Sequence, residues 1–138
     1  TANSPDISIY EIKKLMAKFS RSSDLFYATG GVHVCAICNN DGIIYFEEDI
    51  GRHNALDKVL GKALMENMNL GDKIILASGR ISSEMLTKAV KMGITVVVSR
   101  SAPTSSAVHM ARELNVVLIG FAREEKMNIY SNFSSLKF

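Results

Sequence analysis

The residues best suited to chemistry gather in one stretch, EEDIGRHNALDKVLGKAL, which runs from Glu47 to Leu64. The polar residues of its first half are Asp49, Gly51, Arg52, His53, Asn54, Asp57 and Lys58. A histidine at the start of a helix is a candidate group for acid–base chemistry or base recognition. Asp57 follows His53 by four residues, so that one helix face could hold both and the carboxylate could orient the imidazole. The alternatives are a capping or buried structural role for His53 and a solvated charge for Lys58.

Three further polar segments each carry an arginine and follow an apolar, strand-like run. They are 78–84, 99–105 and 122–126. Helix N-termini present unpaired N–H groups with partial positive charge, and arginine forks onto phosphate oxygens. The first two segments are rich in hydroxyls and lead into predicted helices, which favours an anion site; the alternative is that Ser and Thr only cap those helices. Because no Walker sequence or G-x-G-x-x-G motif is present, this is not one of the common phosphate loops.

These segments can meet only if the elements before them form one sheet. Short β-prone runs predict strands over 32–38, 43–46, 73–77, 94–98, 116–121 and 128–130. Amphipathic patterns predict helices that start near residue 9, where Ser8 and Glu11 form a capping box, and over 82–92 and 104–114. A hairpin turn is predicted at 39–42. Strand–helix alternation favours an α/β fold with a mostly parallel sheet, an antiparallel N-terminal hairpin and helices on both faces.

The helix inside the polar stretch has a predicted buried stripe. Its members are Ala55, Leu56, Val59, Leu60, Ala63 and Leu64.

In open α/β sheets, ligands bind beyond the carboxyl ends of the strands, and the arginine-bearing segments follow those ends. The sequence therefore predicts one anion-binding edge of the sheet.

Length and composition limit the classes of protein. A chain of 138 residues predicts a single domain, with an N-terminal helix within 1–24 and a frayed tail at 131–138. The net charge of +2 is too small to indicate nucleic acid as the main partner, and no apolar run is long enough to span a membrane. Two cysteines do not make a disulfide scaffold, which favours a reducing, cytoplasmic setting.

Cys35 and Cys38 form a C-x-x-C pattern inside a predicted strand. Successive residues of a strand point to opposite faces, so two thiols that lie three positions apart are expected on different sides of the sheet. They are predicted to be buried structural residues rather than a redox pair. No second C-x-x-C or H-E-x-x-H completes a zinc site, so no metal is predicted.

Several motifs together resemble one family, that of the formate dehydrogenase accessory proteins, FdhD/NarQ. The motifs are Thr29–His33, Glu48–Lys58, Ser78–Glu84, Ser101–Ser105, Gly120–Arg123 and Asn128–Ser131. The resemblance implies a three-layer α/β/α fold similar to that of cytidine deaminases. The deaminase motifs H-x-E and P-C-x-x-C are missing, which argues against deamination.

The resemblance implies a sulfurtransferase that is required for formate dehydrogenase activity. Such a protein takes persulfide sulfur from a cysteine desulfurase and delivers it to the molybdenum cofactor, bis(molybdopterin guanine dinucleotide). In the family, the carrier cysteine lies in an upstream C-G-x-C-G loop that this chain does not contain. The chain is therefore interpreted as a C-terminal domain that binds cofactor but does not transfer sulfur alone, with no catalytic residue of its own.

The family's cofactor-binding stretch corresponds, by resemblance, to Phe121–Lys126. The complete predicted cofactor site is Gly51, Arg52, His53, Asn54, Asp57, Ser78, Gly79, Arg80, Ser82, Ser101, Ala102, Pro103, Thr104, Phe121, Ala122, Arg123, Glu124, Glu125 and Lys126. GDP is the expected mimic of the cofactor, and a homodimer could present two such sites. Two alternatives stay open: a deaminase-like nucleotide enzyme, which predicts zinc, and a non-catalytic scaffold, which predicts no guanine nucleotide binding.

Overall fold

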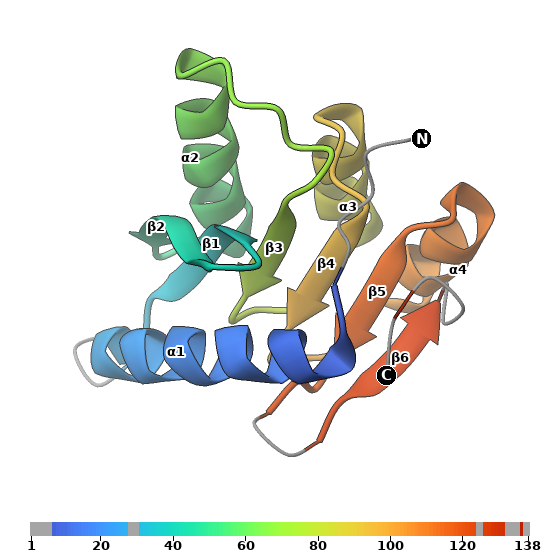
Figure 1. The fold of residues 1–138 in the computed structure, drawn as a ribbon, viewed down its shortest axis with the longest axis horizontal. Helices are drawn as coiled ribbons and strands as arrows, with labels where there is room; N and C mark the ends of the chain where they lie inside the picture. Colours follow the sequence, from blue (N-terminus) through green and yellow to red (C-terminus); the bar gives the residue numbers. More distant parts are fainter. Residues whose placement is uncertain (1–6, 28–30, 124–125, 132–135, 137–138) are drawn as a thin grey trace.

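The computed structural model describes residues 7–27, 31–123, 126–131 and 136 of the chain. Its elements, in chain order, are α1 (Ile9–Tyr27), β1 (His33–Asn39), β2 (Gly42–Asp49), α2 (Arg52–Met65), β3 (Ile74–Ala77), α3 (Ser83–Lys91), β4 (Val96–Ser99), α4 (Ser105–Leu114), β5 (Val117–Gly120) and β6 (Asn128–Ser131). The strands form one sheet in the order β2-β1-β3-β4-β5-β6 (Figure 1). The predicted elements are therefore all present, with ends shifted by a few residues.

The sheet is covered on both faces, as predicted. Helix α1 packs through Ile12, Met16 and Phe19 against one face, where the strands contribute alternate valines and isoleucines. Helices α2, α3 and α4 pack against the other face (Figure 1). The alternating side chains of each strand thus divide the core into two apolar layers.

The prediction of a mostly parallel sheet is wrong. Strands β3, β4 and β5 are parallel, but β1 is antiparallel to both β2 and β3, and β6 is antiparallel to β5. A parallel neighbour requires a long crossover, and only a short segment without a helix separates β5 from β6. The chain therefore turns back along β5, and the sheet is mixed.

Helix α1 begins at the capping box predicted from the sequence. The Ser8 hydroxyl accepts a hydrogen bond from the Glu11 amide at 3.1 Å, and the Glu11 carboxylate accepts one from the Ser8 amide at 3.1 Å. Two orphan amides at the helix start are satisfied in this way.

Two other local predictions are wrong. Leu64 is 64 % exposed, whereas the other five members of its predicted stripe are buried. Successive residues are about 100° apart around a helix, which places Leu64 beyond the margin of the stripe. Ser131, expected in a frayed tail, is buried; its hydroxyl donates to the Val116 carbonyl at 2.5 Å and accepts from the Leu118 amide at 3.0 Å. Leu136 is also buried, and the other residues of that tail lie outside the described part.

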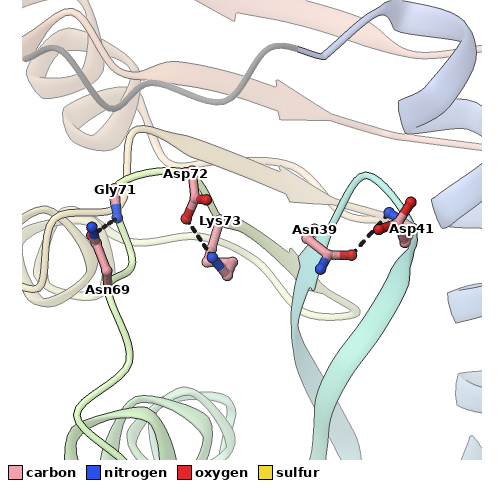
Figure 2. Close-up of polar contacts among 6 residues, drawn as sticks. All are labelled: Asn39, Asp41, Asn69, Gly71, Asp72 and Lys73. Carbon is pink, nitrogen blue, oxygen red and sulfur yellow. Dashed lines mark hydrogen bonds and ion pairs between the residues drawn. The ribbon is translucent and has the colours of Figure 1, made fainter.

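The edge of the sheet where β1 ends and β3 begins consists of turns held by local polar contacts (Figure 2). Asn39 accepts hydrogen bonds from the amides of Asp41 and Gly42, and Asn69 accepts one from the amide of Gly71. Lys73 pairs with Asp72 beside them. These Asx-type bonds explain why Asn occurs at each turn. No helix in the described part of the chain is long and apolar enough to cross a membrane.

Candidate functional site at the carboxyl edge of the sheet

The opposite edge of the sheet collects the segments predicted to bind an anion. The carboxyl ends of β3, β4 and β5 lie there because these strands are parallel. Strand β2 ends at the same edge, since β1 runs antiparallel to both β2 and β3 and lies between them. The starts of β1 and β6 complete the edge, where His33 pairs with Asp49 and Asn128 pairs with Gly120. The predicted convergence of these segments is confirmed, whereas binding stays a prediction.

Three serines join the strands at this edge. The Ser78 hydroxyl accepts from the Val34 amide at 3.0 Å, and the Ser101 hydroxyl donates to the Ser78 carbonyl at 2.8 Å. The Ser99 hydroxyl donates to the Gly79 carbonyl at 2.6 Å and accepts from the Ser101 amide. A hydroxyl has one proton to donate, so Ser99 and Ser101 have none left for a ligand. These serines connect the loops by hydrogen bonds within the protein.

The hydroxyls at the two helix starts are capping groups. Ser82 accepts from the Met85 amide at 3.2 Å, and Thr104 accepts from the Ala107 amide at 3.1 Å. The capping alternative is therefore confirmed for both residues. The loops before these helices are joined as well: the Thr104 amide donates to the Ile81 carbonyl at 2.8 Å. A ligand at this edge would meet two helix N-termini whose positions relative to each other are fixed.

Two glycines of the edge, Gly79 and Gly120, leave room for protein side chains. A methyl group on Gly79 would lie 2.8 Å from His33 Nδ1 and 3.3 Å from Arg52 Cβ. A methyl group on Gly120 would lie 2.8 Å from Cδ of Pro103. The space beside each of these glycines is therefore occupied by other residues of the protein. Pro103 serves to pack the loop after β4 against the end of β5.

The turn between β2 and α2 is organised by Asp49. Its carboxylate accepts from the Gly51 amide at 2.9 Å and pairs with Lys58 Nζ at 3.1 Å. The hydrogen bond from the Gly51 amide is the main reason that the pKa of Asp49 is lowered, and Lys58 and Asn54 add to the effect. Part of the polar cluster in the sequence thus holds this turn, and Lys58 is paired rather than only solvated.

The prediction that Asp57 orients His53 is wrong. Both carboxylate oxygens of Asp57 contact Lys88 Nζ on α3, at 3.0 and 3.1 Å. The two residues do follow one another by one helical turn, but the Asp57 carboxylate pairs with Lys88 on the neighbouring helix. His53 is half-buried at the start of α2.

Two arginines at the edge, Arg80 and Arg123, have exposed side chains. Arg80 is exposed, and no hydrogen bond or ion pair of its side chain is found among the described residues. Arg123 is exposed and anchored: its Nη1 donates to the Arg100 carbonyl at 2.6 Å and to the Ala122 carbonyl at 3.0 Å. Among the residues that the structure describes, Nε and Nη2 of Arg123 have no hydrogen-bond partner, and the planar guanidinium to which they belong suits phosphate. Arg52 adds a third guanidinium from the start of α2.

The residues of the predicted stretch 121–126 have different surroundings in the structure. Phe121 adopts a positive φ of 51° and is 46 % exposed, which is unusual for an aromatic residue. Ala122 is fully buried, so that its side chain is part of the core. The Lys126 carbonyl accepts from the Arg123 amide at 2.7 Å, and the Lys126 side chain is exposed. Glu124 and Glu125 lie outside the described residues. Ala102, half-buried, contributes its carbonyl to the Ile81 amide.

Both cysteines are buried on opposite faces of β1, as predicted. Cys35 belongs to the core under α2, α3 and α4, where it lines a small apolar cavity, and Cys38 belongs to the core under α1. Burial raises the pKa of the Cys35 thiol far above its usual range and that of Cys38 to about 12. Neither thiol has the exposure or the thiolate character that a sulfur carrier needs. Within the described ranges, no group of three metal-ligating side chains is close enough to hold an ion.

His33 lies at this edge but is absent from the predicted site residues, because the sequence showed it only as the last residue of the Thr29–His33 motif. The hairpin register places it opposite Asp49, beside the start of the polar cluster. The predicted antiparallel hairpin already implied this neighbourhood.

A family model of the FdhD/NarQ family matches residues 1–137. The chain belongs to this family. Among curated relatives of the family, the sulfur carrier protein FdhD of Listeria monocytogenes is 50% identical over 125 residues, which are 91% of this chain and 48% of the relative. That of Bacillus subtilis is 48% identical over 118 residues, covering 86% of this chain and 45% of the relative.

A family member of known structure is similar throughout the fold. A crystal structure described as that of a formate dehydrogenase accessory protein from Desulfotalea psychrophila superposes with a TM-score of 0.87 at 31% identity, covering 96% of this chain and 57% of that chain. The chain thus spans about half the length of the curated relatives that it matches.

Proposed function

We propose that this chain is the cofactor-binding part of a sulfur carrier that serves formate dehydrogenase. The carboxyl edge of its sheet would bind the guanosine diphosphate ends of bis(molybdopterin guanine dinucleotide). The observation that carries the proposal is the presence of Arg52, Arg80 and Arg123, from three different segments, at the edge that also holds two fixed helix N-termini. Guanidinium groups and helix N-termini are the usual partners of phosphate.

The sulfur-transfer part of the proposal is supported by the relatives, which are named sulfur carrier proteins. A cysteine desulfurase would supply the persulfide sulfur, and the cofactor would receive it. Because Cys35 and Cys38 are buried with raised pKa values, we place the carrier thiol outside residues 1–138. Residues 1–138 alone are then expected to bind cofactor without transferring sulfur, and a homodimer would offer one site to each guanosine end.

Titration with GDP tests the cofactor-binding proposal. Arg80→Ala and Arg123→Ala should each weaken GDP binding by about 1.5–3 kcal/mol, the usual value of a hydrogen bond to a charged group. Lys91→Ala is the matched control, because Lys91 is an exposed cation at the far end of α3 and should leave affinity unchanged. Isothermal titration calorimetry measures all four proteins, and thermal unfolding shows whether Arg123→Ala stays folded.

The other two candidate functions make different predictions for the same samples. A deaminase-like enzyme predicts stoichiometric zinc, which elemental analysis of the purified chain would detect. A scaffold without a nucleotide site predicts no heat of GDP binding. Wild-type affinity in both arginine variants would count against the proposed site even if GDP binds elsewhere.

A further inference from the structure

His33 lies at the arginine-bearing edge, between the ends of β2 and β3. It begins β1, pairs across the hairpin with Asp49 and packs its ring against Gly79, with the Cβ of Arg52 on the same glycine. Arg80 follows Gly79 directly in the chain. The imidazole therefore lies between the segments that carry Arg52, which is half-buried, and Arg80, which is exposed.

The two ring nitrogens of His33 have different surroundings. Nδ1 is buried and has no hydrogen-bond partner in the part of the chain that the structure describes. The nearest acidic group in the register, Asp49, is already engaged by the Gly51 amide and Lys58. A proton on Nδ1 would be a buried donor without an acceptor, which is unfavourable. A neutral ring therefore carries its proton on Nε2.

We propose that His33 is a ligand-binding residue whose Nε2–H donates a hydrogen bond to a phosphate oxygen of the bound nucleotide. The side chain is half-buried with Nδ1 on its buried side, which leaves Nε2 as the nitrogen that faces the edge. A hydrogen-bond donor between the segments of Arg52 and Arg80 matches a pyrophosphate, whose oxygens accept from several directions. This inference rests on the proposed function and assigns a residue and a tautomer to the same site.

Two substitutions of His33 distinguish a hydrogen bond made by Nε2 from one made by Nδ1. The amide nitrogen of glutamine reaches the position of Nε2, whereas asparagine places a polar atom only near Nδ1. His33→Gln should keep GDP affinity within about threefold, and His33→Asn should weaken it about tenfold or more, as expected for a lost hydrogen bond to a charged group. Guanosine, which has no phosphate, should bind both variants equally. Thermal unfolding checks that both variants fold.

Nitrogen-15 spectra of the histidine rings provide a test on the wild-type chain itself. At pH 8 the ring of His33 should show the Nε2–H tautomer, and the Nε2 signal should shift on addition of GDP but not of guanosine. An Nδ1–H tautomer would overturn the assignment whatever the ligand data. If His33→Asn bound GDP as tightly as the wild type while Arg80→Ala bound it more weakly, His33 would not belong to the site. The proposed function would still hold in that case. Loss of GDP binding by the wild type would remove both.

Discussion

Replacing Gly120 with alanine tests the packing that holds the candidate site together. The added methyl group would lie 2.8 Å from Pro103 Cδ, 2.9 Å from Tyr130 Cε2 and 3.1 Å from the Ser101 carbonyl oxygen. Real contacts of this kind are about 3.5–4.0 Å, so at least one of the three groups must move. The proline ring and the carbonyl belong to the backbone of one loop and cannot swing aside as a flexible side chain does.

The expected cost follows from this crowding. Overfilling a packed interior typically destabilises a protein by about 1–3 kcal/mol. Because the loop after β4 is bonded to both neighbouring loops, through the Thr104 and Phe121 amides, we expect a value towards the upper end. Gly61→Ala is the matched control: a methyl group there meets nothing within 4 Å, in the middle of α2. Alanine should stabilise that helix by about 0.5–1 kcal/mol.

Urea unfolding followed by circular dichroism measures both variants. The midpoint should fall for Gly120→Ala and rise for Gly61→Ala, with an unchanged slope in each case. If Gly120→Ala were as stable as wild type, the close approach of the loop after β4 to β5 would be wrong. A loss of stability in Gly61→Ala would instead indicate that the exposed face of α2 has been assigned incorrectly.

Two further predictions concern titratable groups. The lowered pKa of Asp49 means that its contacts stabilise the fold above about pH 4 and are lost as the pH falls through the folded-state pKa. The stability difference between wild type and Asp49→Asn should therefore shrink on acidification in urea titrations, and a constant difference would show that the charge is unimportant. The raised pKa values of Cys35 and Cys38 predict that both thiols resist iodoacetamide at pH 8 until the chain is unfolded in urea. Mass spectrometry counts the labels, and rapid labelling of either thiol in the native protein would contradict its burial.

Much of the fold was predictable because local signals and burial agreed. The capping box at Ser8 and Glu11, the Asn39–Gly42 turn and the caps at Ser82 and Thr104 are decided by residues within four positions of each other. The alternation of Cys35 and Cys38 between two faces follows from strand geometry alone. The mixed character of the sheet was missed because pairing direction depends on how the chain returns, as it does after β5.

The sequence predicted where the candidate site lies but not which contacts its residues make. The sequence alone determined that polar, arginine-bearing segments follow the strands, since strand order along the chain and residue types are local information. Only the tertiary structure decided which of those groups are used internally. Partners distant in the sequence accept or donate the hydrogen bonds of Ser99, Ser101 and Asp57. The side chain of His33, which lies on β1, contacts Gly79, which follows β3. Hydrogen bonds and close packing across the sheet depend on register and distance, which no single segment of the chain encodes.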